Sequence, residues 1–459
     1  MTIPATTPRA GPVVAVIVLG TILNPLDATM VAVALAPMHT YFGVSVAEVS
    51  LLVTSFFVAG AVGQTLMGKL AEVFGARRVL RSGLLAVAIS CALAPFAPSL
   101  GWLIVLRVGQ ALGSSVAFPT GMTIIRRQLT RAPAQAMGAV TTANTLSAAV
   151  GPYVGGLLVS WMGWQAIFFA NIPVALLAVA LAGRLLPPDP PHSREIARVD
   201  VPGAGLYTAT LVAMLVFLLG LGSPASWIAL AAAVPLMAGF LLWERRTREP
   251  FLDIRLMVRQ LVLLGVFAQY ALANVAYYGM LFAVPTWLQV ARGTDPATTG
   301  LVLVPMAVCS AALTPLAAYW IHRRGPAATL CTASVVLAVG GALLFTVQTG
   351  TSLVLVAIYS VLAGIHNNPN TLGLQAVLYQ HTATEQTGTV SGVFQSFRYI
   401  GSILSTALLG LAFGHQASDG AIRLFAATLF AVGVLITIMN VGRRAKSRGR
   451  EVDSPSTAR

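Results

Sequence analysis

Long apolar runs separated by short polar segments dominate the pattern along this chain of 459 residues. A helix needs about 20 apolar residues to cross roughly 30 Å of hydrocarbon, and runs of that length recur along the whole chain. The pattern therefore predicts transmembrane helices. About fourteen spans are expected, over residues 13–34, 48–66, 79–97, 101–123, 136–159, 165–186, 204–222, 226–243, 261–290, 298–320, 327–347, 351–379, 388–413 and 421–442.

Composition and charge narrow the class of protein. Hydrophobic residues make up 57% and charged residues only 9%, against roughly 25% charged in soluble domains. With both termini placed in the cytoplasm, 24 of the 28 Lys and Arg lie in inner segments; Arg292 and Arg423 lie outside, and Arg107 and Arg398 within spans. This bias predicts a multi-pass protein of the cytoplasmic (inner) membrane with cytoplasmic termini. It also explains the net charge of +14 without a nucleic-acid partner.

The distribution of spans predicts an all-α integral membrane protein with an internal repeat. Two nearly polar-free spans form a hairpin between two six-span halves, and the second span of each half is followed by a similar turn, at 68–78 and more weakly at 322–325. We expect a cytoplasmic tail (1–12), a six-helix bundle (13–186), a linker with the inserted hairpin (187–260), a second six-helix bundle (261–442) and a basic cytoplasmic tail (443–459).

The chain carries no motif for nucleotide or metal chemistry. The phosphate-binding pattern G-x-x-x-x-G-K-[ST] does not occur, so we expect no ATP as partner and an ion gradient as energy source. Cys91, Cys309 and Cys331 are far apart, and no spacing typical of a metal site is present. No clustered acid–base set within the spans favours an enzyme, so a membrane enzyme or signalling protein is the least supported alternative.

Charges inside the spans point to one candidate site. Of the 14 Asp and Glu residues, only Asp27 lies well inside a predicted span, where a charge costs about 2.5 to 3.5 kcal/mol. It lies about 12 Å below the outer end of its span, and Arg107 lies about 9 Å below the outer start of the fourth span. We therefore expect the two to face each other. Burial disfavours the carboxylate and the guanidinium favours it, so a change in their separation would bind or release a proton; a static structural ion pair is the alternative.

The loop at 68–78 (GKLAEVFGARR) resembles the signature loop between the second and third helices of the major facilitator superfamily. The resemblance implies that this loop gates the inner side of the transporter, through Gly68, Glu72, Gly75, Arg77 and Arg78. Glycines there allow close approach and a turn, and the acid and cations form a pairing that breaks and reforms. The chain departs from the family pattern at Glu72, where Asp is usual, and at 73 and 76, where cations are common.

Other motifs resemble the fourteen-helix drug:proton antiporter group of that superfamily. The segment 106–113 (LRVGQALG), with Gly113, is similar to its Arg-x-x-Gln-Gly-x-Gly motif, and 151–156 (GPYVGG), with Gly151, Pro152, Gly155 and Gly156, to its glycine–proline antiporter motif. Segments 26–35, 163–173 and 287–289 are similar as well. The resemblance implies alternating access between two six-helix bundles, with Asp27 and Arg107 coupling protons and the 151–156 helix as a hinge.

Other polar residues within the spans are expected to line an aqueous cavity. Span 9 supplies an aromatic group suited to amphipathic ligands, although packing explains such residues equally well. Arg398 adds a second positive charge, which leaves neutral and anionic substrates open. The candidate cavity residues are Asn24, Asn144, Gln269, Tyr270, Asn274, Tyr277, Tyr278, His366, Asn367, Asn368, Gln395 and Arg398.

The resemblance to the antiporter group thus implies a proton-coupled antiporter that exports small amphipathic compounds such as drugs, dyes and antibiotics. Its partners would be a small-molecule substrate, protons and the lipid bilayer, with no cofactor and no metal. Two alternatives on the same fold stay open. One is a dedicated exporter of a lipid, siderophore or metabolite. The other is a proton-coupled importer, because transmembrane spans and a buried charged pair are compatible with either direction of transport.

Overall fold

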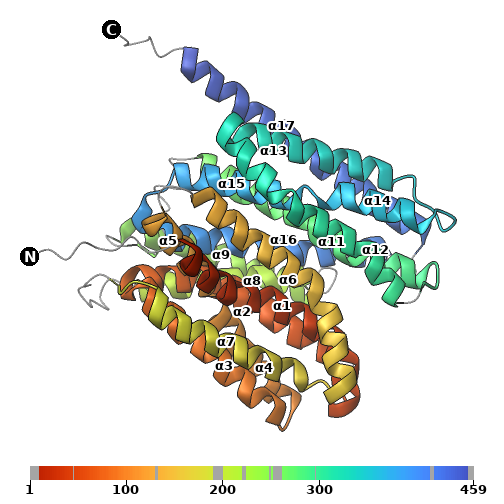
Figure 1. The fold of residues 1–459 in the computed structure, drawn as a ribbon, viewed down its shortest axis with the longest axis horizontal. Coiled ribbons are helices and arrows are strands. Elements are labelled where there is room, and N and C mark those ends of the chain that lie inside the picture. Colours follow the sequence, from red (N-terminus) through yellow and green to blue (C-terminus); the bar gives the residue numbers. More distant parts are fainter. Residues whose placement is uncertain are drawn as a thin grey trace, which may run out of the picture. The chain divides into compact units, whose positions relative to one another are not determined.

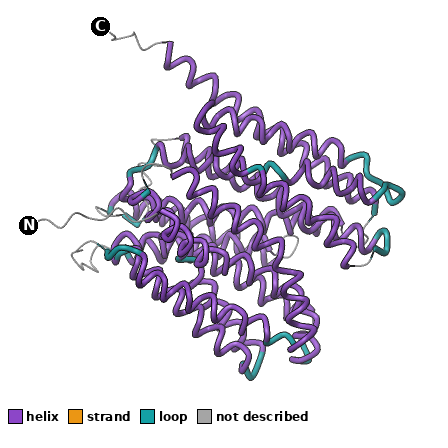
Figure 2. Tube along the Cα trace, viewed as in Figure 1, coloured by secondary structure: helices purple, strands orange, loops and turns teal. Residues whose placement is uncertain are grey.

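The computed structural model describes residues 10–44, 46–129, 133–189, 200–219, 224–247, 250–251, 261–294, 296–413 and 418–452. Within these ranges the regular secondary structure is helical and contains no strand, as Figure 2 shows. The expectation of an all-α chain is therefore confirmed for the described residues. The chain divides into two compact units, Met1–Leu261 with Thr382–Ile400, and Val262–His381 with Gly401–Arg459.

The first unit is built around α1, which packs against α6 and α7. In the same unit α3 packs against α4 and α7, α2 packs against α4, and α8 pairs with α9 and touches α2 (Figure 1). Small residues allow the closest crossings, because Gly83 of α3 lies against Gly113 of α4. The helices are α1 (Ala10–Phe42), α2 (Val46–Phe74), α3 (Ala76–Leu93), α4 (Leu100–Ser114), α5 (Ala117–Gln128), α6 (Pro133–Met162), α7 (Ala166–Leu185), α8 (Val201–Leu219) and α9 (Pro224–Arg246).

The second unit packs α13 against α14, α15 and α17, and α12 against α14. Its apolar core includes the fully buried Trp287, together with Met280 of the same helix and Phe425. α16 (Thr387–Phe413) begins in the first unit and ends in the second. The other helices are α11 (Leu261–Val290), α12 (Pro296–Ala312), α13 (Thr314–Leu344), α14 (Leu353–Gly364), α15 (Asn367–Gln380) and α17 (Asp419–Val452).

The backbone repeats with an offset of 250 residues. Gly43 and Gly293 share a φ of 63°, and the turns at Gly75 and Gly325 have φ of 97° and 77°. α4 ends at 114 and α5 begins at 117, just as α14 ends at 364 and α15 begins at 367. Pro119 and Pro369, also 250 apart, explain these paired breaks, because a proline cannot donate to the carbonyl four residues earlier. The backbone therefore carries the internal repeat that the two similar turns predict.

Length and apolarity support a multi-pass membrane protein. Within the described ranges nine helical stretches are long and apolar enough to cross a membrane, and the two segments of α6, bent by 46°, make a tenth if they form one span. This number is lower than fourteen partly because Leu301–Leu344 counts once although its backbone turns at Gly325, and because α14 and α15 are each shorter than a span. The expectation of fourteen spans stays a prediction.

Candidate functional site

A buried ion pair joins α1 to α4. Asp27 lies two residues after Pro25 in α1, and Arg107 lies in the middle of α4. The guanidinium donates through Nη1 to Oδ2 of Asp27, and the side chains of Arg107 and Asp27 are 1% and 3% exposed. Each charge needs the other, because removing one partner of a buried pair leaves an uncompensated charge. The structure brings the two predicted residues together, and their role in proton coupling stays a prediction.

Two carboxamides complete the contacts of the Asp27 carboxylate. Gln110 Nε2 and Asn171 Nδ2 both donate to Asp27 Oδ1, each at 2.9 Å. Gln110 also accepts from Arg107 Nη1 through its Oε1 at 2.7 Å. Gln110 follows Arg107 by three residues and so shares its face of α4, whereas Asn171 comes from α7. The sequence motifs contain both amides but gave neither a role; the only signal was the spacing of Gln110.

An aromatic ring and a thiol surround this cluster. The ring of Phe56, from α2, has its centroid 4.2 Å from Cζ of Arg107, which is the geometry of a cation–π contact. Phe56 is 1% exposed and packs with Ala59 and Ala111 in a small apolar cluster. Cys91 of α3 lies with its Sγ 3.1 Å from Gln110 Nε2. Sequence reasoning missed Phe56, because one Phe in an apolar span carries no distinguishing signal.

Asn24 connects the ion pair region to α16. It precedes Asp27 by three residues, so both lie on one face of α1. Asn24 Nδ2 donates to Ser114 Oγ at 2.9 Å, and its Oδ1 accepts from the hydroxyl of Tyr399 at 2.8 Å. Arg398 makes a longer contact to the same oxygen, 3.5 Å from its Nη2. The structure therefore brings the predicted Asn24 and Arg398 together, and it adds Tyr399, which sequence reasoning missed.

The loop motif at 68–78 contacts the beginning of α16. Gly68 lies so close to the backbone of Gly388 that a Cβ at position 68 would overlap its carbonyl group. Glu72 accepts through Oε1 from the backbone N–H of Thr389 at 2.7 Å and through Oε2 from the hydroxyl of Thr389 at 2.8 Å. A carboxylate at a helix N-terminus is favourable, because it offsets the unpaired N–H groups and the helix dipole.

The other end of this motif is bound by the segment after α7. Gly75 has a φ of +97°, which a residue with a side chain rarely adopts, and it permits the turn from α2 into α3. Asp189 accepts from the backbone N–H groups of Arg77, at 2.9 Å, and Arg78, at 3.0 Å. The guanidinium of Arg77 donates to the carbonyl of Gly183. Asp189 therefore caps α3, a contact that the sequence did not predict.

The glycine–proline motif lies where α6 crosses α1. A Cβ at Gly151 would collide with Thr29, and one at Gly155 would meet Met30, so both glycines allow the helices to approach beside Asp27. The segments Pro133–Ala148 and Tyr153–Met162 are bent by 46° relative to each other, and Gly151 lies between them. The motif's last glycine, Gly156, is half-buried. Its function as a hinge stays a prediction.

The predicted cavity residues of the second unit lie in its packed interior. Asn274 donates to the carbonyl of Tyr270 at 2.8 Å, and the ring of Tyr277 lies 5.6 Å from that of the half-buried Tyr278, centroid to centroid. The ring nitrogens of His366 lie 2.6 Å from the carbonyl of Ala363 and 3.4 Å from that of Ala273. Two amide contacts continue this interior, Gln269 to Asn370 at 3.0 Å and Asn368 to Thr314 at 3.0 Å. In the first unit, Asn144 is half-buried on α6.

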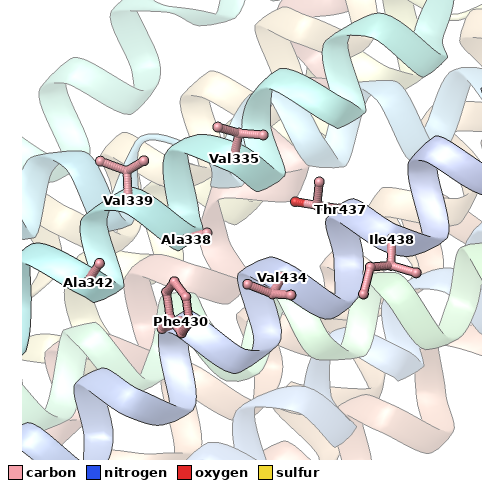
Figure 3. A pocket seen from close by; sticks show the side chains of 8 residues that line it. All are labelled: Val335, Ala338, Val339, Ala342, Phe430, Val434, Thr437 and Ile438. Carbon is pink, nitrogen blue, oxygen red and sulfur yellow. The ribbon is translucent and has the colours of Figure 1, made fainter.

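A separate groove runs between α13 and α17 in the second unit (Figure 3). It has a volume of about 260 Å³, and the hydroxyl of Thr437 is the only polar group on the side chains that line it. Val335, Val339, Phe430 and Ile438 of its wall are exposed. Such a surface favours contact with hydrocarbon, and its side chains include no titratable group to bind a proton and only one hydroxyl to bind a polar substrate. Among the described residues no three His, Cys, Asp or Glu side chains gather as a metal site requires.

Comparison with known proteins identifies the family and the fold. Residues 17–406 match the family model described as Major Facilitator Superfamily. The chain is 34% identical over 406 residues to the uncharacterized MFS-type transporter YwoD of Bacillus subtilis, covering 86% of this chain and 89% of the relative. It is 29% identical to the tetracenomycin C resistance and export protein of Streptomyces glaucescens, covering 90% and 77%. The fold matches the human organic anion transporter MFSD10 (TETRAN) with a TM-score of 0.71 at 18% identity, over 94% and 100% of the two chains.

Proposed function

Because the chain belongs to the major facilitator superfamily, whose members are membrane transporters and not enzymes, we propose that it is a proton-coupled antiporter that exports small amphipathic compounds by alternating access. The observation that carries the proposal is the buried pair of Asp27 and Arg107. A carboxylate that is 3% exposed and touches a guanidinium responds strongly to the distance between them. Such a group takes up a proton when the pair opens and gives it up when the pair closes.

The loop motif supplies the gate in this scheme. Glu72 and Gly68 bind the first turn of α16, so the inner ends of α2 and α16 separate only when these contacts break. Asp189 holds the turn into α3 in position while this happens. The α1–α6 crossing at Gly151 lies beside Asp27, which offers a route by which protonation changes helix packing.

The arrangement in the membrane belongs to the same proposal. Fourteen spans with cytoplasmic termini in the cytoplasmic membrane agree with the Lys and Arg bias and with the repeat of 250 residues. The two six-helix bundles are then 13–186 and 261–442, with α8 and α9 as the inserted hairpin. The tails at 1–9 and 453–459, and most of the linker at 190–199, lie outside the described residues.

The first test is transport of a fluorescent lipophilic cation into inside-out vesicles energised with a proton gradient. Wild type is expected to accumulate the dye, and Asp27→Asn is expected to lose at least tenfold in the initial rate, because the amide cannot release a proton. Equal transport by both proteins, at equal expression and thermal stability, would show that Asp27 is structural. Export without a gradient would contradict proton coupling.

A dedicated exporter of one compound is the second candidate, favoured by a relative that is named for a single compound, tetracenomycin C. A broad panel of dyes and antibiotics separates the two candidates. Resistance to many unrelated compounds in a sensitive host supports a multidrug exporter. Resistance to none, with an Asp27-dependent proton leak induced by one metabolite of the source organism, supports the dedicated one. Gradient-driven dye movement out of these vesicles would indicate an importer.

A further inference from the structure

The two oxygens of the Asp27 carboxylate have different partners. Oδ1 accepts from two neutral amides, Gln110 Nε2 and Asn171 Nδ2, at 2.9 Å each. Oδ2 accepts from the Arg107 guanidinium. The amides come from α4 and α7, so the carboxylate is fixed from two helices on one oxygen and paired with a cation on the other.

Protonation affects these contacts unequally. A neutral carboxylic acid carries its proton on one oxygen, and the other remains a carbonyl oxygen that accepts hydrogen bonds. Amide N–H groups donate to such a carbonyl as they do to a carboxylate. A guanidinium has donors only, so it offers no acceptor to an acid O–H that points toward it. The contacts at Oδ1 therefore persist in both protonation states, and the contact at Oδ2 does not.

We propose that Asn171 and Gln110 are positioning residues that hold Oδ1 of Asp27 in both protonation states, so that the proton enters at Oδ2 and Arg107 is the group released. This inference rests on the proposed function, because it assigns roles around the proposed coupling acid. Its consequence is that α1 keeps its register against α4 and α7 during the proton cycle, while the arginine side chain moves.

The surroundings of Arg107 suit such a release. Gln110 Oε1 accepts from its Nη1 at 2.7 Å, and the Phe56 ring lies 4.2 Å from its Cζ. Its Nε and Nη2 have no hydrogen-bond partner within the described part of the chain, so only Nη1 is bonded. When the guanidinium of Arg107 leaves Asp27, it can therefore still contact the amide oxygen of Gln110 and the ring of Phe56. Gln110 therefore binds both residues of the pair, because its Nε2 donates to Asp27 and its Oε1 accepts from Arg107.

No other described side chain that faces Asp27 competes for this proton. The helices packed on α1 are α2, α4, α5, α6 and α7. Arg107 is the charged group among the contacts of Asp27, and the thiol of Cys91 is reached through Gln110. The two other residues bound to the carboxylate, Gln110 of α4 and Asn171 of α7, do not titrate. Neither do the residues at the nearby contacts, where Phe56 of α2 packs on Arg107 and Gly151 of α6 lies against Leu26 and Thr29.

The test is infrared difference spectroscopy of the full-length protein in lipid, titrated with acid. The C=O band of protonated Asp27 is the one that Asp27→Asn removes. In Asn171→Leu this band is expected to shift to higher wavenumber, because its carbonyl oxygen loses a donor.

Asn440→Leu is the matched control, because it removes a buried amide of α17 in the second unit, and it is expected to leave the band unchanged. Asn171→Ala repeats the test should the leucine variant fail to fold. An Asp27 band that stays at its wild-type position in either Asn171 variant would overturn this inference and leave proton coupling intact. If Asp27→Asn removes no C=O band from the difference spectrum, both proposals are overturned.

Discussion

Tyr399 places a phenol in the interior of the first unit, and its hydroxyl donates to Asn24 Oδ1 at 2.8 Å. Its ring tip lies against Gly60, where a Cβ would come within 2.9 Å of Cζ. We expect Tyr399→Phe to cost about 1 to 3 kcal/mol of folding stability, because it removes the principal donor to a buried oxygen. Thermal unfolding in detergent measures this loss.

Tyr153→Phe is the matched control, because Tyr153 is 71% exposed. The control variant is expected to unfold at the wild-type temperature. Equal melting temperatures for all three proteins would contradict a stabilising role for the Tyr399 hydroxyl.

Charge made the ion pair predictable from sequence, and the lack of charge concealed its neighbours. An Asp or Arg inside an apolar span is rare and costly, so Asp27 and Arg107 stand out without a structure. Asn171 and Phe56 belong to residue types that occur throughout membrane helices. Their contact with the pair depends on how α7 and α2 pack, which no local pattern encodes.

At the scale of elements, the first turn of α16 is bound by a side chain of α2, Glu72. The Glu72 carboxylate binds both the backbone and the hydroxyl of Thr389, and Glu72→Gln removes its charge while nearly preserving its shape. We expect the variant to weaken this contact between α2 and α16, the proposed gate, by about 1 kcal/mol, because the helix N-terminus favours an anion. The inner ends of α2 and α16 should then separate more often.

A single cysteine at Ser396, which is 1% exposed, reports this separation in a protein with the three native cysteines replaced. Labelling by a water-soluble maleimide is expected to be several-fold faster with Glu72→Gln than without it. Glu385→Gln, at an exposed acid two residues before the start of α16, should leave the rate unchanged. Slower labelling with Glu72→Gln would contradict the gate.

Helix positions follow the apolar runs closely, but the breaks inside them were not predicted. The runs at 101–123 and 351–379 were each expected as one span, and each contains two helices, α4 with α5 and α14 with α15. The sequence held the signal in Pro119 and Pro369. Single prolines in apolar runs were not assigned a break, because membrane helices tolerate proline when neighbouring groups satisfy the freed carbonyl.

At the scale of the whole molecule, the number of spans depends on whether α8 and α9 cross the membrane. Trp227, 63% exposed near the start of α9, lies outside the cell if they do. We expect a cysteine at Trp227 to react with an impermeant maleimide in intact cells. Ser99→Cys should react as the outer control and Ala383→Cys should not, as the inner control. Labelling of Trp227→Cys only after lysis would place the hairpin on the inner side and reduce the number of spans.

The 250-residue repeat duplicates the backbone without duplicating the ion pair. Tyr277 stands at the position equivalent to Asp27, and Ala357 at the position equivalent to Arg107. In the proposed mechanism, with Asp27 as the single coupling acid, one proton is exchanged per cycle. Export of a monovalent cation is then electroneutral, and only the pH difference drives it, by about 1.4 kcal/mol per pH unit. A neutral substrate leaves one net charge moving inward, so the membrane potential adds about 2.3 kcal/mol per 100 mV. Cells that maintain a potential but little pH difference would therefore export neutral compounds more effectively than cationic ones.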